Sequence, residues 1–174
     1  MDQKRNHLLA FFAGFVCLTA IDQWTKGLAV DFLKGKGPLV LWDGVFELLY
    51  SENRGAAFGM LQNQKAFFIF VAFVILGVIG YVLYKMPDDR KYRILHVLLS
   101  LIAAGAIGNM IDRIRLDYVV DFIYFVLINF PIFNIADIYV SVSTAALVIL
   151  LLFFYKENDL NFISFKQKRY RELK

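Results

Sequence analysis

The sequence predicts an all-α integral membrane protein in which four transmembrane helices carry a small β-sheet on their outer side. Hydrophobic residues make up 59% of the 174 positions and the mean hydropathy is +0.57, an apolar share well above that of an ordinary soluble domain. Four apolar stretches approach the roughly 20 residues that a helix needs to cross a bilayer. No linker, repeat or low-complexity tract divides the chain, so we expect one integral membrane domain over residues 1–174.

The four expected spans differ in polarity. The first carries Asp22 and Lys26 in its last third, whereas the second carries no charge at all. The third becomes small and polar toward its end, and the fourth starts directly after Asp137. A cleavable signal peptide is the alternative for the first span, but the residues around Cys17 do not suit the cleavage sites of such segments. The expected boundaries are 8–29, 66–84, 94–111 and 138–155.

Basic residues mark the orientation of these spans. They precede the first span, crowd the connection between the second and third, and follow the fourth. The residues are Lys4, Arg5, Lys85, Arg90, Lys91, Arg93, Lys156, Lys166, Lys168, Arg169, Arg171 and Lys174. Because cytoplasmic loops carry an excess of Lys and Arg, we expect both termini in the cytoplasm and segments 30–65 and 112–137 outside. The net charge of +4 therefore indicates orientation, and no nucleic-acid partner is expected.

The first outer segment, 30–65, has the signals of a hairpin. Two short β-prone runs flank Asp43-Gly44, and Asp-Gly between such runs is typical of a tight turn between strands. A small sheet at the membrane surface is therefore expected. The Gly- and Ala-rich stretch NRGAAFGMLQ, residues 53–62, then leads back into the second span.

Polar residues on three spans fall on single helix faces. In the third span these are Gly105, Gly108, Asn109, Asp112 and Arg113. In the fourth they are Asn134, Asp137, Ser141 and Thr144, provided that the helix begins near Asn134. In the first span, Asp22 precedes Lys26 by four positions, the favourable order for a helical ion pair. Since a polar side chain costs about 2.5–3.5 kcal/mol at the bilayer centre, we expect the three stripes to converge inside the bundle.

Most of these residues have a structural interpretation. Small residues let membrane helices approach closely, which is the interpretation we favour for Gly105, Gly108, Ser141 and Thr144. Asp22 with Lys26, and Asp112, are expected to support the fold. The single cysteine, Cys17, has no partner for a disulfide or a zinc site, and His7 and His96 are far apart in sequence and expected at helix ends.

Asp121 and Asp137 are harder to explain as supports, because no Lys or Arg lies between them. If the fold brings the two acids together, repulsion and desolvation raise the pKa of one, and the pair shares a proton. One carboxylate can then deprotonate a water while the other protonates a carbonyl oxygen, as in peptide hydrolysis without a covalent intermediate. From spacing alone, three interpretations stay open: an aspartic hydrolase, a small ion- or proton-coupled transport subunit that uses both acids, and a structural bundle.

Five motifs, taken together and in this order, resemble those of the prolipoprotein signal peptidases, the type II signal peptidases of bacteria. They are Asp22-Gln23-Trp24-Thr25-Lys26, Asn53-Arg54-Gly55-Ala56-Ala57-Phe58-Gly59, Gly105-Ala106-Ile107-Gly108-Asn109-Met110-Ile111-Asp112-Arg113, Val119-Val120-Asp121-Phe122 and Phe133-Asn134-Ile135-Ala136-Asp137. The resemblance covers nearly the whole chain. Where the family often has a pair of glycines, this chain has Ala104-Gly105, a change that affects how closely the third helix packs.

The resemblance implies an intramembrane aspartyl endopeptidase of the bacterial plasma membrane. It would cut the signal peptide from prolipoproteins just before a cysteine that carries diacylglycerol, with Asp121 and Asp137 as the catalytic pair. Residues implied to line the site and bind substrate are Asn53, Asn109, Arg113 and Asn134, while those implied to support it are Asp22, Lys26, Gly55, Gly105, Gly108 and Asp112. No metal or organic cofactor is implied. We expect a monomer with membrane lipid around it and the site near the outer face.

Overall fold

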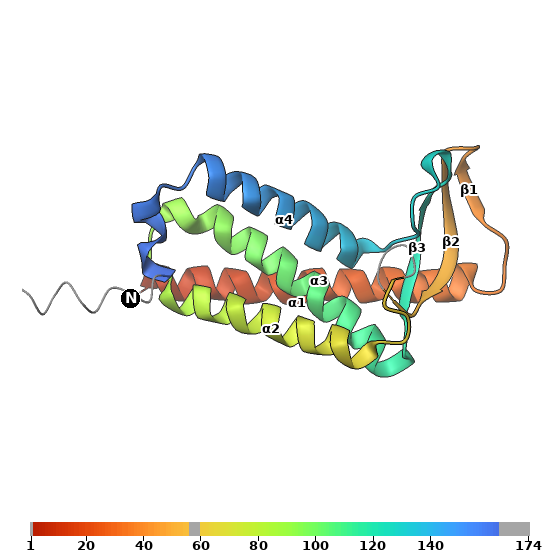
Figure 1. Cartoon of the computed structure of the whole chain (residues 1–174), viewed down its shortest axis with the longest axis horizontal. Coiled ribbons are helices and arrows are strands. Elements are labelled where there is room, and N and C mark those ends of the chain that lie inside the picture. The colour runs from red at the N-terminus through yellow and green to blue at the C-terminus, as the bar shows by residue number, and fades with distance from the viewer. Residues whose placement is uncertain (1, 56–59, 164–174) are drawn as a thin grey trace, which may run out of the picture.

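The computed structural model describes residues 2–55 and 60–163, with side chains from residue 5 onward. Four long helices lie side by side and a small sheet stands at one end of them (Figure 1). The helices are α1 (Asp2–Leu33), α2 (Lys65–Lys85), α3 (Arg93–Leu116) and α4 (Ile135–Phe153). By length and composition, each is able to cross a membrane. The prediction of four membrane-spanning helices is confirmed.

Three antiparallel strands form the sheet in the order β1-β2-β3. They are β1 (Leu39–Trp42), β2 (Phe46–Asn53) and β3 (Val119–Phe125). The predicted turn at Asp43-Gly44 joins β1 to β2, and Gly44 takes the left-handed backbone conformation, with φ of +67°, that glycine favours. Strand β3 was not predicted, although its β-branched and aromatic residues are typical of strands. It pairs with β2 and places Asp121 opposite Ser51.

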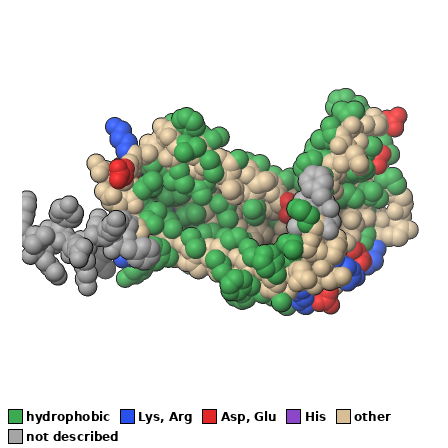
Figure 2. Space-filling model, in the orientation of Figure 1, with side chains coloured by type: hydrophobic (Ala, Val, Ile, Leu, Met, Phe, Trp, Pro, Cys, Tyr) green, Lys and Arg blue, Asp and Glu red, His purple; other side chains and the backbone are tan. Residues whose placement is uncertain are grey.

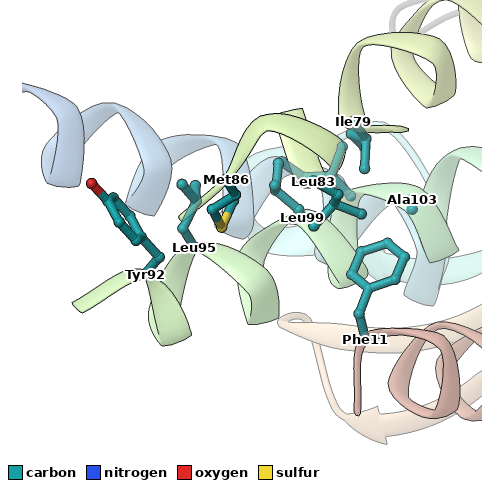
Figure 3. Close-up of a cluster of buried hydrophobic side chains, with 9 residues drawn as sticks. Phe11, Ile79, Leu83, Met86, Tyr92, Leu95, Leu99 and Ala103 are labelled. Carbon is teal, nitrogen blue, oxygen red and sulfur yellow. The ribbon is translucent and has the colours of Figure 1, made fainter. Parts of the chain in front are cut away.

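Helix α3 is the centre of the bundle because it contacts α1, α2 and α4. At the end away from the sheet, its apolar side chains pack with those of α1 and α2 (Figure 3). This cluster consists of Phe11, Ile79, Leu83, Met86, Tyr92, Leu95, Leu99, Ile102 and Ala103. A second apolar cluster joins the end of α1 to β3 through Ala29, Leu33, Val120, Phe122 and Ile123. The sheet is therefore anchored to the bundle through β3.

The outward surface of the bundle is apolar, as expected for helices that face lipid rather than water. Figure 2 shows hydrophobic side chains over the helices, with charged side chains toward the two ends of the molecule. Large apolar residues on all four helices are exposed, among them Val16, Phe73, Val97 and Leu152. The surface supports assignment as a multi-pass membrane protein.

Close packing between α3 and α4 depends on Gly105. A Cβ atom at this position would lie 2.5 Å from the carbonyl oxygen of Ala136, closer than real side chains approach. The packing interpretation of Gly105 therefore agrees with the structure. For Ser141 and Thr144 it is wrong, because both are exposed, while Ser143 is the buried serine of α4.

Candidate active site

The start of α4 presents Asp137 through a reciprocal cap. The Asn134 side chain accepts a hydrogen bond from the Asp137 backbone N–H at 3.0 Å. In return, Asp137 Oδ2 accepts from the Asn134 backbone N–H at 3.1 Å. Such a capping box satisfies helix N–H groups that otherwise have no partner. It also fixes the Asp137 carboxylate relative to the backbone.

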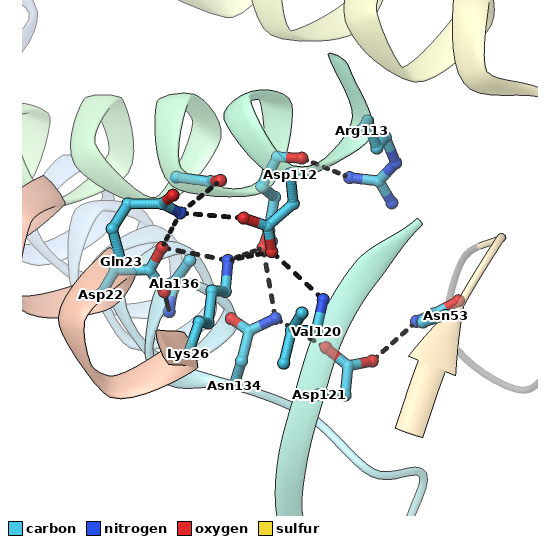
Figure 4. Close-up of polar contacts among 12 residues, drawn as sticks. Asp22, Gln23, Lys26, Asn53, Asp112, Arg113, Val120, Asp121, Asn134 and Ala136 are labelled. Atoms are coloured by element: carbon cyan, nitrogen blue, oxygen red, sulfur yellow. Dashed lines mark hydrogen bonds and ion pairs between the residues drawn. The ribbon is translucent and has the colours of Figure 1, made fainter. Parts of the chain in front are cut away.

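The second carboxylate, Asp121, lies on β3 and is held by two amides. Asn134 Nδ2 donates to Asp121 Oδ1 at 2.6 Å, and Asn53 Nδ2 donates to Asp121 Oδ2 at 2.9 Å (Figure 4). Asn134 therefore donates to both acids, through its side chain to Asp121 and through its backbone to Asp137. The fold brings together two carboxylates that lie sixteen positions apart in the sequence.

Asn109 of α3 connects the pair to a buried lysine. Its Nδ2 donates to Asp137 Oδ1 at 2.8 Å, while its Oδ1 accepts from Lys26 Nζ at 2.9 Å. The same oxygen accepts from Asn134 Nδ2 at 3.2 Å. The orientation of the Asn109 amide is thus determined by its neighbours, with the N–H₂ group toward Asp137.

The predicted ion pair between Asp22 and Lys26 forms at 3.0 Å, and Lys26 also pairs with Asp112 at 3.1 Å. Each carboxylate holds a further element. Asp22 Oδ1 accepts from the backbone N–H of Ala136 in α4, and Asp112 Oδ2 accepts from the backbone N–H of Val120 in β3. The three charged residues therefore tie α1 and α3 to the two segments that carry Asp137 and Asp121.

Arg113 lies beside the pair and does not bond to Asp112. Its Nη2 donates to the carbonyl oxygen of Gly55 at 3.0 Å, and its guanidinium lies 4.3 Å from the centre of the Phe68 ring. Gly55 is itself fixed, since its N–H donates to Asn53 Oδ1 at 2.9 Å and a Cβ atom there would collide with the carbonyl oxygen of Met60. Arg113 thus holds the turn after β2 against α2 and α3.

A cleft of about 600 Å³ opens next to these residues, between α2, α3, α4 and the segment before α4. Its polar side chains are those of Asn53, Asn109, Arg113, Asp137 and Ser141. Its apolar walls include Phe68, Val71, Ala72, Ile75, Met110, Phe130, Ile132 and Val140. Asp121 is only 1% exposed and adjoins the cleft through Asn53. Figure 2 shows an acidic side chain in a hollow of the apolar face.

Burial and the nearby charge of Asp137 raise the pKa of Asp121 to about 7, from an ordinary value of 3.8. Both effects disfavour the ionised form of a carboxyl group. Burial and the neighbouring charge therefore favour the protonated form of Asp121 up to neutral pH. The amide donors of Asn53 and Asn134 act in the opposite direction, and the effect of burial is larger.

Sequence reasoning missed one residue of this network. Gln23 Nε2 donates to Asp112 Oδ1 at 2.9 Å, to the Gly108 carbonyl oxygen at 3.2 Å and to Asp22 Oδ2 at 3.2 Å (Figure 4). In the sequence, the one sign of this role was that Gln23 directly follows Asp22.

Residues 56–59 of the expected substrate loop and 164–174 of the basic tail lie outside the described residues.

Comparison with known proteins decides the family. The model of the family described as signal peptidase (SPase) II matches residues 14–153. This chain belongs to the signal peptidase II family. It is therefore an endopeptidase of the aspartic class, and a transport role finds no support in the comparisons.

Relatives of this signal peptidase II resemble it over most of its length. A lipoprotein signal peptidase from Caldanaerobacter subterraneus subsp. tengcongensis is 46% identical over 134 residues, covering 76% of this chain and 89% of the relative. One from Clostridioides difficile (strain 630) is 44% identical, covering 80% and 92%. A solved structure of a bacterial membrane enzyme at 2.3 Å resolution superposes with a TM-score of 0.75 at 31% identity, covering 82% of this chain and 87% of that one. The predicted fold class, four transmembrane helices with a small sheet, is confirmed, and so is the prediction of a multi-pass bacterial membrane protein.

Proposed function

We propose that this signal peptidase II removes the signal peptide from diacylglyceryl-modified prolipoproteins, cutting before the lipidated cysteine with Asp121 and Asp137 as its catalytic pair. The observation that carries the proposal is the position of Asn134, which donates to both carboxylates. Two acids held next to one another, with the pKa of Asp121 raised toward neutral, are the arrangement that hydrolysis by a carboxylate pair requires.

Asp137 and Asp121 divide the proton transfers between them. Asp137, on the cleft wall, takes a proton from a water, whose oxygen attacks the scissile carbonyl carbon, while Asp121 gives its proton to the carbonyl oxygen. The product is a neutral tetrahedral diol. When it collapses, Asp137 returns its proton to the leaving amine nitrogen and Asp121 recovers a proton from a hydroxyl group. The C–N bond breaks, and both acids end as they began.

The cleft matches a substrate that is partly peptide and partly lipid. Asn53 and Arg113 offer polar groups to an unwound peptide backbone, which otherwise loses its internal hydrogen bonds in a membrane. Apolar walls from α2 and α4 suit the small residues before the cysteine and its acyl chains. Asn109 and Asn134 orient the acids, while Lys26, Asp22 and Asp112 support them.

The site lies at the outer end of the protein in our proposal, with both termini in the cytoplasm and a monomer surrounded by lipid. Basic residues support this orientation. Arg90, Lys91 and Arg93 lie at the connection between α2 and α3, at the end of the bundle away from the sheet, and cytoplasmic connections are the ones enriched in Lys and Arg (Figure 1).

The test is cleavage by purified protein of a prolipoprotein that bears or lacks the diacylglyceryl group, with products identified by mass spectrometry. The unchanged protein is expected to cut only the lipidated precursor, between the cysteine and the residue before it. Asp121→Asn and Asp137→Asn should each reduce the rate by about 10²–10⁴-fold or more. The matched control is Asp43→Asn in the turn between β1 and β2, which should leave the rate unchanged. Full cleavage by either variant of the pair would refute the proposed roles.

A further inference from the structure

A second cavity, of about 150 Å³, lies between α1 and α3 at the end of the bundle away from the sheet. We refer to it as the α1–α3 groove. Its residues from α1 are His7, Ala10, Phe11, Gly14 and Leu18, and those from α3 are Arg93, His96, Val97 and Ser100. These positions recur every three or four residues on both helices, so each helix contributes one continuous face. None of them takes part in the proposed peptide cleavage.

One end of the α1–α3 groove is polar. His7 and His96, distant in the sequence, lie with ring centres 5.4 Å apart. Each is fixed by a neighbour: His7 Nδ1 lies 3.2 Å from Asp88 Oδ1, and His96 Nδ1 lies 3.0 Å from the carbonyl oxygen of Tyr92. The guanidinium of Arg93 at this end is exposed and makes no ion pair within residues 5–55 and 60–163. As far as the described residues go, this guanidinium is therefore available to a ligand at the groove mouth.

The rest of the α1–α3 groove is apolar. Its bottom is formed where the two helices approach, since a Cβ atom at Gly14 would lie 3.1 Å from Ser100 Oγ, whose hydroxyl already donates to the carbonyl oxygen of Phe11. Leu18 lies eleven positions after His7, which corresponds to about 16 Å along a helix. This is close to half of the roughly 30 Å hydrocarbon core of a bilayer. The groove therefore has the length of one leaflet.

We propose that the α1–α3 groove binds one anionic phospholipid from the leaflet opposite to the acid pair. The phosphate would lie at Arg93, where a guanidinium donates two parallel hydrogen bonds to phosphate oxygens, rather than at His7, whose ring faces the Asp88 carboxylate. One acyl chain would follow Ala10, Gly14 and Val97 toward Leu18. The occupant is a lipid because both walls are membrane-spanning helices and, within the described residues, the charged side chain that lines the groove is Arg93, which can bind a headgroup phosphate. The first turn of α3 adds a favourable helix-dipole field.

The experiment is native mass spectrometry of the full chain in detergent, with dioleoyl phosphatidylglycerol or dioleoyl phosphatidylcholine added at equal concentrations. The unchanged protein should retain one phosphatidylglycerol with an affinity about tenfold higher than for phosphatidylcholine. Arg93→Gln should remove that preference, a tenfold loss equal to about 1.4 kcal/mol. Ala10→Phe, which fills the groove, should weaken retention of both lipids.

Two matched variants separate this site from general attraction to the surface. Arg90→Gln removes a neighbouring exposed arginine outside the groove, and Ile94→Phe enlarges an exposed residue of α3 outside it. Both should bind phosphatidylglycerol as the unchanged protein does, and inorganic phosphate at the same concentration should not displace the lipid. Equal retention of the two lipids by the unchanged protein, or unchanged retention by Arg93→Gln, would overturn the proposal. Displacement by inorganic phosphate would also overturn it, because the site would then be a phosphate site.

Discussion

Lys26 is buried to 2% exposure and has a partner for each of its three N–H donors. Nζ bonds to Asp22 at 3.0 Å, to Asp112 at 3.1 Å and to Asn109 at 2.9 Å. A buried ammonium group is tolerated only when it is paired in this way. Because two of these acceptors hold α4 and β3, the single lysine links the supports of Asp137 and Asp121.

Asp112→Asn is expected to lower stability more than activity. The substitution removes one charge from Lys26 and weakens the hold on the Val120 N–H, at a cost of about 1–3 kcal/mol for a buried donor left without a good acceptor. The measurement is the thermal unfolding midpoint in detergent, together with the cleavage rate well below it. Asp117→Asn, which breaks an exposed pair with Lys65, should cost at most about 1 kcal/mol. An Asp112→Asn protein that is stable but inactive would show that Asp112 acts in the chemistry.

The raised pKa of Asp121 predicts that cleavage slows as pH rises through about 7. Above that value Asp121 loses the proton that it must give to the carbonyl oxygen. The measurement is the cleavage rate of a lipidated precursor from pH 5 to 9. A rate that stays level between pH 6 and 9 would contradict the assignment of Asp121 as the acid.

The raised pKa of Asp121 should also make the free energy of unfolding depend on pH. Below about pH 4, Asp121 is protonated in folded and unfolded chains alike, so it does not change the free energy of unfolding as pH varies. Between about pH 4 and 7 the folded chain keeps a proton that the unfolded chain has lost, so the free energy of unfolding falls as pH rises. Asp121→Asn carries no titrating group and should lose this part of the pH dependence of the unfolding midpoint. An unchanged dependence in that variant would exclude Asp121 as its source.

At the scale of elements, the contact between α3 and α4 is expected to tolerate no side chain at Gly105. Gly105→Ala places a Cβ atom 2.5 Å from the Ala136 carbonyl oxygen and 2.7 Å from Val140, so the helices must separate, at a cost of about 1–3 kcal/mol. Since Ala136 precedes Asp137, the cleavage rate should fall as well. Gly77→Ala and Gly80→Ala on α2, where a Cβ atom meets nothing within 4 Å, are the controls and should be neutral or stabilising. Equal stability of all three variants would disprove the close contact.

The sequence was informative about elements whose signals are local. Hydropathy indicated the four helices, Asp43-Gly44 indicated the hairpin, and the spacing of Asp22 and Lys26 indicated their ion pair. Strand β3 was not predicted. Its partner, β2, lies about 70 residues earlier in the chain, and a pairing between strands so far apart cannot be recognised from neighbouring residues. The prediction of which helix faces are buried was less reliable. Ser141 and Thr144 share a face with Asp137 and are nevertheless exposed.

At the scale of the whole molecule, the site combines residues from α1, β2, α3, β3 and the start of α4. Periodicity predicted that polar stripes converge, but it did not predict which atoms meet. That Asn134 would donate to both acids, and that Gln23 would bridge α1 to α3, depends on how the helices pack and where β3 begins. These are long-range properties of the fold, and the five motifs became interpretable together only through the family resemblance.

The proposed orientation of the whole molecule predicts which positions are reachable from outside an intact cell. Cys17 is the only cysteine, so a Cys17→Ser chain provides a background without thiols. Asp43→Cys, in the turn between β1 and β2, should react with a membrane-impermeant maleimide on intact cells, whereas Arg90→Cys should react only after the membrane is opened. The reason is that the sheet and the connection between α2 and α3 lie at opposite ends of the helix bundle (Figure 1). Labelling of position 90 on intact cells, with position 43 protected, would reverse the orientation and place the acid pair on the cytoplasmic side.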